Sequence, residues 1–271
     1  MLHAFSRTEM LLGKPAMDLL ADSRVAVFGI GGVGTFAVEG LVRSGVGKFL
    51  LVDDDQICLT NLNRQIHATR KTIGKAKVDV MRDRILEINP QAEVALLKRF
   101  YMVESRKPSP ASEPVENPLF WSEILRFHQT PGNGIDYLVD AVDTVSAKMD
   151  LVINAQRAGI PVISSMGAGN KLDPTRLQVA DLYHTVNCPL ARIMRKELRK
   201  QGVAALKVVY SQEEPMMPLM KEDNSCNSSC VCPSGTTRTC ITRRTVPGSV
   251  SFVPSVAGLI MAGEVVKDLV R

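Results

Sequence analysis

Four glycines stand where a short apolar run ends and an amphipathic pattern begins. Gly29, Gly31 and Gly34 fit the pattern G-x-G-x-x-G, and Gly32 lies between them, directly after the β-rich run 24–28. Glycines in this context let the backbone turn tightly and approach a phosphate, which accepts hydrogen bonds from free N–H groups at a helix N-terminus. The four residues therefore predict a phosphate-binding turn.

An acidic cluster follows the next β-rich run, 49–52. Asp53 ends that run, where an acidic side chain can accept hydrogen bonds from ribose hydroxyls, and Asp55 belongs to the same cluster. Together with the glycines, Asp53 indicates a bound nucleotide. These two features fit NAD at least as well as ATP, so an NAD-dependent oxidoreductase is one open interpretation.

Three charged residues beyond the cluster favour ATP. Transfer from a triphosphate needs fixed cations for the leaving pyrophosphate and Mg²⁺ on a carboxylate, whereas a dinucleotide needs little beyond the glycine turn. Arg64 and Lys77 supply the cations, and Asp143 supplies the carboxylate. Each residue alone also has an ordinary structural interpretation. Lys77 can be a solvated helix lysine, Asp143 a helix N-cap, and Arg64 the partner of the aspartates.

Alternating strand and helix patterns must position these residues. Hydrophobic runs and periodicity predict strands at 24–28, 49–52, 94–97, 137–140, 161–165 and 207–211, and helices at 35–44, 75–89, 146–158, 189–202 and 254–269. The alternation indicates an α/β, Rossmann-like fold with a mostly parallel, doubly wound sheet. We expect a single domain over 1–271, with a nucleotide-binding half at 1–165 and an elaborated half at 166–271 for substrate and dimer contacts.

The bulk composition is that of an ordinary globular protein. The 271 residues are 45% hydrophobic and 23% charged, and the net charge of +5 leaves room for a polyanionic partner without demanding one. The first residues, 1–17, lack the apolar core of a signal peptide. The longest apolar run, 256–266, contains Glu264 and is too short to cross a bilayer. We expect a cytoplasmic protein without membrane contacts.

Five motifs in order carry a family resemblance. They are Gly29-Ile-Gly-Gly-Val-Gly34, Leu51-Val-Asp53-Asp-Asp55, Asn61-Leu-Asn-Arg64-Gln65, Gly74-Lys-Ala-Lys77 and Asp140-Ala-Val-Asp143. The series resembles the ubiquitin-activating-enzyme superfamily, which includes the ThiF, MoeB and HesA adenylyltransferases, and it covers at least residues 1–165. The resemblance implies a ligase-type enzyme that activates a carboxylate with ATP and Mg²⁺, forming an acyl-adenylate and releasing pyrophosphate.

The same resemblance assigns roles to individual residues. It places the nucleotide on Gly29, Gly31, Gly32, Gly34, Asp53, Asp55, Asn61, Arg64 and Lys77. Within this set it implies that Asp53 holds the ribose, while Asn61, Arg64 and Lys77 hold phosphates. It also implies that Asp143 binds the Mg²⁺ that accompanies ATP.

Arg7 matches a superfamily arginine that reaches the nucleotide of the partner subunit, which implies a homodimer. Some superfamily members carry a catalytic or sulfur-transferring cysteine in the C-terminal half, so a sulfur-relay protein is a further candidate partner. The stretch 247–251 contains no cysteine. This argues against a relay through that position.

A second set of motifs narrows the resemblance to one branch. The stretches 63–68, 163–169, 173–175, 189–192 and 247–254 are similar to the branch that acts on tRNA carrying threonylcarbamoyladenosine. The resemblance implies that ATP activates the free carboxylate of this nucleoside, which lies beside the anticodon. The carbamoyl nitrogen then closes on the activated carbonyl and gives a hydantoin, so the reaction needs no covalent cysteine.

A basic helix supports an RNA substrate independently of the resemblance. Its cations share one face in the helical register and are Arg192, Arg195, Lys196, Arg199 and Lys200. The residues expected to pack inward are Leu190, Ile193, Met194 and Leu198. A stripe of this kind resembles a surface that follows RNA phosphates, although such runs are more often solvated helix faces. With the resemblance, we interpret it as a tRNA-binding face.

A cysteine cluster falls in the loop 212–249, which is rich in Pro, Ser, Cys and Gly. Its members are Cys226, Cys230, Cys232 and Cys240. Four thiolates in one loop could bind Zn²⁺, but the spacing departs from the paired C-x₂-C arrangement, so reduced thiols without a metal are the alternative. The Pro- and Ser-rich stretch 104–118 predicts a solvated loop.

Two functions other than tRNA dehydration stay open besides the oxidoreductase. One is adenylation of the C-terminus of a ubiquitin-like sulfur carrier, although the paired C-x₂-C motifs of that group are missing. The other is a non-catalytic tRNA-binding scaffold with the same fold. The presence of Arg64, Lys77 and Asp143 favours catalysis over a scaffold.

Overall fold

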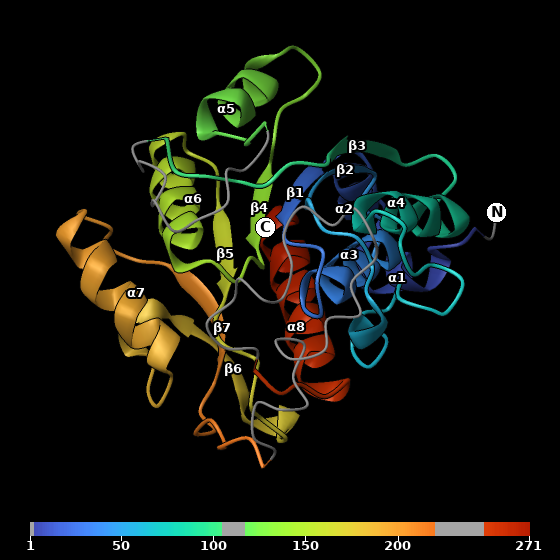
Figure 1. Cartoon of the computed structure of the whole chain (residues 1–271). Coiled ribbons are helices and arrows are strands. Elements are labelled where there is room, and N and C mark those ends of the chain that lie inside the picture. The colour runs from blue at the N-terminus through green and yellow to red at the C-terminus, as the bar shows by residue number, and fades with distance from the viewer. Residues whose placement is uncertain (1–2, 105–116, 220–246) are drawn as a thin grey trace.

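A seven-stranded sheet forms the centre of the computed structural model, which describes residues 3–104, 117–219 and 247–271 (Figure 1). The strand order is β3-β2-β1-β4-β5-β7-β6. The strands are β1 (Arg24–Phe28), β2 (Lys48–Val52), β3 (Glu93–Leu97), β4 (Tyr137–Asp140), β5 (Val162–Ser165), β6 (Leu177–Asp181) and β7 (Lys207–Ser211). All neighbouring strands are parallel except β6, which pairs antiparallel with β7 at the sheet edge.

The register brings the carboxyl ends of three central strands to one edge of the sheet. Phe28 at the end of β1 pairs with Val52 on β2 and with Asp140 on β4. The loops that follow these strands therefore begin side by side. Ligands of open α/β sheets bind at this edge, where the strand order reverses about β1 and β4.

Helices cover both faces of the sheet (Figure 1). They are α1 (Ser6–Leu12), α2 (Lys14–Asp22), α3 (Gly34–Arg43), α4 (Lys77–Ile88), α5 (Trp121–Gln129), α6 (Val145–Arg157), α7 (Pro189–Lys200) and α8 (Phe252–Leu269), with short 3₁₀ turns η1 (Leu59–Asn61), η2 (Pro174–Arg176) and η3 (Leu182–His184). Because side chains alternate along a strand, each face of the sheet has its own apolar core. One core contains Phe28 of β1 with Leu151 of α6 and Leu198 of α7. The other contains Val27 of β1 with Leu41 of α3 and Met261 of α8.

Helices α3 and α8 pack closely because glycines remove the side chains between them. A Cβ atom on Gly258 would lie 2.3 Å from the carbonyl oxygen of Val33, and one on Gly40 would lie 2.6 Å from the Cβ of Ala262. Val33 directly precedes α3. The last helix of the chain therefore supports the segment from which the nucleotide-binding turn enters α3.

The predicted fold class is confirmed, because the sheet is mostly parallel and is covered by helices on both faces. Sequence periodicity missed α1, α2, α5 and the edge strand β6. Most of the stretch 104–118 lies outside the described residues. In the part of the chain that is described, no helix has both the length and the apolar character needed to cross a bilayer.

Candidate nucleotide-binding site

The glycine turn has the conformation that its sequence predicts. Gly29 has a φ of +86°, and a Cβ atom there would lie 2.6 Å from the carbonyl oxygen of Ala141. A Cβ atom on Gly34 would lie 1.8 Å from the carbonyl oxygen of Gly29, so no larger residue can close the turn. The turn leads directly into α3, and the backbone of the loop after β4 lies against it.

The side chain of Asp53 fixes this turn from the adjacent strand. Its Oδ2 atom accepts a hydrogen bond of 2.6 Å from the backbone N–H of Ile30, and Oδ1 accepts one of 2.9 Å from the N–H of Asp55. Burial raises the pKa of Asp53, and the positive charge of Lys77 opposes this rise. The carboxylate is thus placed beside the turn, as a ribose-binding group would be.

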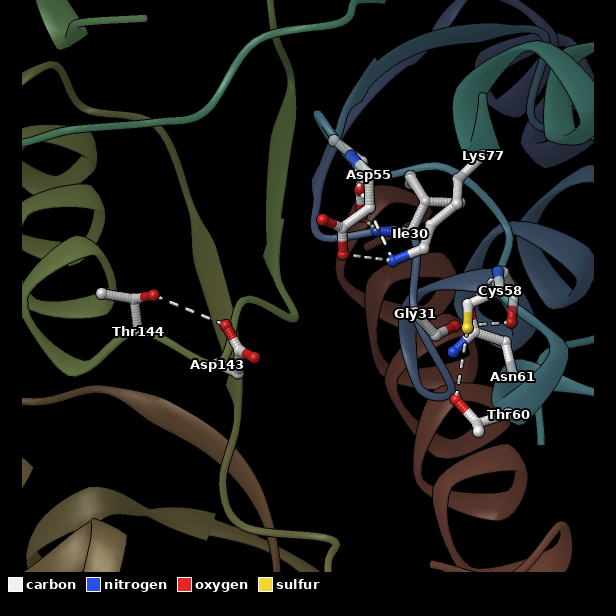
Figure 2. A network of polar contacts seen from close by, with 11 residues as sticks. Ile30, Gly31, Asp55, Cys58, Thr60, Asn61, Lys77, Asp143 and Thr144 are labelled. Atoms are coloured by element: carbon white, nitrogen blue, oxygen red, sulfur yellow. Dashed lines mark hydrogen bonds and ion pairs between the residues drawn. The ribbon is translucent and has the colours of Figure 1, made fainter. Parts of the chain in front are cut away.

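Lys77 joins the same cluster from the first turn of α4. Its Nζ atom lies 2.7 Å from Oδ2 of Asp55 and 3.7 Å from Oδ1 of Asp53 (Figure 2). Only 5% of Lys77 is exposed. The interpretation of Lys77 as a solvated helix lysine is therefore wrong, because the side chain is buried and pairs with two aspartates. The two ion pairs hold the ammonium group of Lys77 in a fixed position beside the glycine turn.

Arg64 approaches the turn from the segment after η1. A Cβ atom on Gly32 would lie 3.3 Å from Cγ of Arg64, so the aliphatic stem of the arginine lies against the glycine turn. Its guanidinium donates to the carbonyl oxygen of Thr60 at 2.8 Å and to Oδ1 of Asn63 at 2.9 Å. The side chain of Asn61 accepts from the N–H of Cys58 at 3.0 Å and closes the 3₁₀ turn η1.

Asp143 lies on the loop after β4 and is exposed. Its Oδ1 atom accepts from the hydroxyl of Thr144 at 3.4 Å (Figure 2). The N-cap position of α6 is Thr144, one residue after Asp143, and the Thr144 side chain makes no capping hydrogen bond. An exposed carboxylate at this edge fits Mg²⁺, which is usually held by one or two carboxylates together with phosphates and water.

A buried charge network beneath this loop escaped the sequence analysis. Lys148 of α6 and Asp140 of β4 are both fully buried, with Nζ 2.9 Å from Oδ2, and Ser164 donates to the same oxygen at 2.6 Å. Lys148 also donates to the carbonyl oxygen of Val142 at 3.2 Å. One signal was present in the sequence. Lys148 lies on the apolar stripe of α6, three residues before Leu151, where a lysine needs a buried partner.

Two buried polar side chains beside the glycine turn lack hydrogen-bond partners among the described residues. They are Gln65, through Oε1, and His67, through both ring nitrogens. Burial and the charge of Lys77 lower the pKa of His67 to about 3, so its imidazole is neutral at physiological pH. Both residues stand within the family motifs, but their types and spacing alone gave neither of them a role.

Helix α7 presents its cations in three different ways. Arg195 is half-buried and donates through Nη1 to the carbonyl oxygen of Thr185 at 2.6 Å. Arg199 lies over the ring of Tyr183 at 5.1 Å, and Lys200 pairs with Glu197 at 2.9 Å.

The exposed cations of α7 include Arg192 and Lys196. Ala191, Met194 and Leu198 form the buried side of the helix. The predicted inward position of Ile193 is wrong, because 46% of it is exposed. Residue 193 falls between the buried side and the basic face, where packing against the core does not reach.

Other predicted site residues remain predictions. Arg7 is exposed on α1, and its contact with the nucleotide of a partner subunit is untested. The four cysteines predicted to bind Zn²⁺, at 226, 230, 232 and 240, lie outside the described residues.

The fold and the glycine–aspartate–lysine geometry define a Rossmann-like nucleotide-binding protein. Residues 5–271 match the model of the ThiF family. The chain belongs to the ThiF family.

Several similar proteins carry more specific names. The chain is 43% identical to a tRNA threonylcarbamoyladenosine dehydratase of Bacillus subtilis over 273 residues, covering 100% of this chain and 96% of the relative. A crystal structure of the E. coli tRNA N6-threonylcarbamoyladenosine dehydratase in complex with ATP superimposes with a TM-score of 0.74 at 31% identity, covering 98% of this chain and 93% of that one. A sulfur carrier protein ThiS adenylyltransferase of E. coli is 36% identical over 169 residues, covering 60% of this chain and 59% of the relative.

Proposed function

We propose that this protein is an ATP-dependent dehydratase of threonylcarbamoyladenosine in tRNA. The observation that carries the proposal is the end-to-end similarity to the Bacillus subtilis dehydratase, which extends over both the nucleotide site and the C-terminal half. The geometry of the site is consistent with it, because a phosphate-binding turn, a buried lysine and an exposed carboxylate lie at one sheet edge.

The first half-reaction is adenylation of the nucleoside carboxylate. A carboxylate oxygen attacks the α-phosphorus of ATP, the bond to the bridging oxygen breaks, and pyrophosphate leaves with the electron pair. Arg64 and Lys77 stabilise the charge that grows on the departing pyrophosphate, because both are fixed beside the glycine turn. Asp143 would hold Mg²⁺, which when bound neutralises phosphate charge.

The second half-reaction closes the hydantoin ring. The carbamoyl nitrogen of the same nucleoside attacks the activated carbonyl, loses its proton, and AMP leaves with the former carboxylate oxygen. Because nucleophile and electrophile belong to one substrate, the protein acts by positioning the nucleoside. The site therefore works with cations and carboxylates, and Cys58, which is buried in the loop after β2, is not required as a nucleophile.

The tRNA would approach over α7 in this proposal. Arg192 and Lys196 are exposed there, and Arg195 and Arg199 are held in place by Thr185 and Tyr183. Fixed cations lose less side-chain entropy when they meet a phosphate than free ones do. A homodimer with Arg7 reaching the partner's nucleotide belongs to the same proposal.

A carrier-protein adenylyltransferase is the second candidate function. It is favoured by the similarity to the ThiS adenylyltransferase over 60% of the chain. This match covers a smaller share of both chains than the match to the dehydratase does.

The two functions are separated by asking which substrate drives ATP consumption. We expect AMP and pyrophosphate to form with Mg²⁺ and tRNA carrying threonylcarbamoyladenosine, and not with a ubiquitin-like carrier protein. Asp143→Asn should abolish this turnover without lowering the melting temperature, because Asp143 is exposed. Pyrophosphate release that depends on the carrier alone, with the AMP kept on the carrier as an acyl-adenylate, would replace the proposal by the second candidate.

A further inference from the structure

An acid-free, basic segment connects the two phosphate-binding cations. From Gln56 to Val78 the sequence has no aspartate or glutamate, although 28 acidic residues occur in the chain. The lysines and arginines of this segment are Arg64, Arg70, Lys71, Lys75 and Lys77. Arg64 and Lys77 have been placed beside the glycine turn above. The remaining three, Arg70, Lys71 and Lys75, lie in residues 69–75, here named the basic loop, and are not among the residues assigned to the nucleotide above.

The three cations of the basic loop are exposed and, within the described part of the chain, have no ion-pair partner. No carboxylate of residues 3–104, 117–219 or 247–271 forms a salt bridge with Arg70, Lys71 or Lys75. The cations of α4 directly afterwards differ in this respect. Arg82 pairs with Asp83 at 2.7 Å, and Arg84 pairs with Glu39 at 2.6 Å. The basic loop therefore carries three positive charges that do not pair with any carboxylate of the described residues.

The backbone of the basic loop is held by a dense set of hydrogen bonds. The hydroxyl of Thr72 accepts from the N–H of Thr69 at 2.8 Å and donates to the carbonyl oxygen of His67 at 2.9 Å. The N–H of Gly74 donates to the carbonyl oxygen of Ile57, and the N–H of Ile57 donates to that of Lys75, both at 2.9 Å. The cations are thus presented from a fixed backbone, and binding an anion there does not require the loop to order.

The position of the basic loop places it beside the reaction centre. It follows Arg64 and ends where Lys77 begins α4. Helix α4 packs in the core that contains α3, whereas α7 packs in the core on the other face of the sheet (Figure 1). The two basic surfaces therefore lie on opposite sides of the edge that carries the nucleotide turn.

We propose that the basic loop is a second tRNA-binding surface, which contacts the phosphates flanking the reacting nucleoside. This inference rests on the proposed function. A nucleoside whose carboxylate reaches the α-phosphate of ATP brings its neighbouring phosphates to the rim of the site, and exposed cations there gain counter-charges. A carrier protein would instead insert one terminal carboxylate into the site and leave the three cations uncompensated.

The test compares two double charge reversals that change the net charge equally. One is Arg70→Glu with Lys71→Glu in the basic loop, and the control is Arg126→Glu with Arg157→Glu, which alters exposed residues of α5 and α6. Affinity for tRNA carrying threonylcarbamoyladenosine is measured by fluorescence anisotropy at several salt concentrations. AMP affinity and the melting temperature are measured on the same samples.

We expect the loop variant to bind tRNA about tenfold more weakly, with a salt dependence reduced by about 1.5 in log–log slope, while the control changes less than about twofold. AMP affinity should stay at the wild-type value in both variants. Equal effects of the two reversals on tRNA binding would overturn the proposal for the loop, even if the wild type turns over tRNA. A wild type that binds no tRNA would overturn both this inference and the proposed function.

Discussion

At the scale of single residues, the ion pair between Lys148 and Asp140 is a buried interaction that supports the fold near the site. Both side chains are fully buried. Removing one partner of a buried pair leaves the other charge uncompensated, which costs more than the pair contributes. The network also holds the carbonyl of Val142, next to Asp143.

Lys148→Met should therefore lower the free energy of unfolding by about 3–5 kcal/mol in urea denaturation. Adding Asp140→Asn in the same chain should recover part of the loss, since the orphaned charge is removed. A loss below about 1 kcal/mol for Lys148→Met would contradict the buried pair.

His67 links stability to pH in a defined direction. Burial, followed by the charge of Lys77, lowers its pKa from 6.5 to about 3, so below pH 6.5 the unfolded chain binds a proton that the folded chain does not. The contribution of the neutral His67 side chain to the free energy of unfolding is fully present above pH 6.5 and is lost as the pH falls from 6.5 toward 3. Asp53, whose pKa burial raises, acts in the opposite direction, but it is present in both proteins of the comparison below and cancels in their difference.

Acidification from about pH 7.5 to about pH 5 should lower the free energy of unfolding of the wild type more than that of His67→Gln, because only the wild type has the buried imidazole. The difference should change by up to about 1.4 kcal/mol per pH unit below the unperturbed histidine pKa. Parallel pH profiles of unfolding free energy for the two proteins would show that His67 does not carry a lowered pKa.

At the scale of elements, the contact between α3 and α8 decides how the glycine turn is supported. Gly258 lets α8 approach the carbonyl of Val33, just before α3 begins. A Cβ atom on Gly263 of the same helix would meet no atom of the described residues within 4 Å. The two glycines therefore offer a matched pair, because one substitution collides with the backbone and the other does not.

Gly258→Ala should lower the free energy of unfolding by about 1–3 kcal/mol through overpacking and should weaken AMP binding, since the collision pushes on the entrance to α3. Gly263→Ala should leave binding unchanged and stabilise the helix by about 0.5–1 kcal/mol. Calorimetric titration with AMP, together with thermal denaturation, measures both quantities. Unchanged AMP affinity in Gly258→Ala would mean that α8 does not support the turn.

The elements that sequence reasoning found are those whose periodicity is undisturbed. β1 and α3 flank a glycine pattern, and their positions follow from apolar runs and helical spacing. The sequence pattern did not predict α5, because this helix follows a Pro- and Ser-rich stretch. It did not predict β6 either, because β6 is an edge strand with a half-exposed surface. Lys148 escaped because its partner Asp140 is close only in the folded chain.

At the scale of the whole molecule, the arrangement places charge on both sides of one sheet edge. The nucleotide turn lies at the carboxyl ends of β1, β2 and β4, and basic surfaces lie on α7 and on the basic loop. A folded RNA is wide enough to contact separated patches, whereas an extended protein tail would follow one groove. The distribution of charge therefore agrees with the similarity to tRNA-modifying relatives.

The most direct test of the proposed function is the mass of the nucleoside after reaction. The protein is incubated with ATP, Mg²⁺ and tRNA carrying threonylcarbamoyladenosine, and the digested nucleosides are analysed by mass spectrometry. We predict loss of one water from that nucleoside, with one AMP formed for each nucleoside converted. An unchanged nucleoside mass in the presence of active, ATP-binding protein would contradict the proposal.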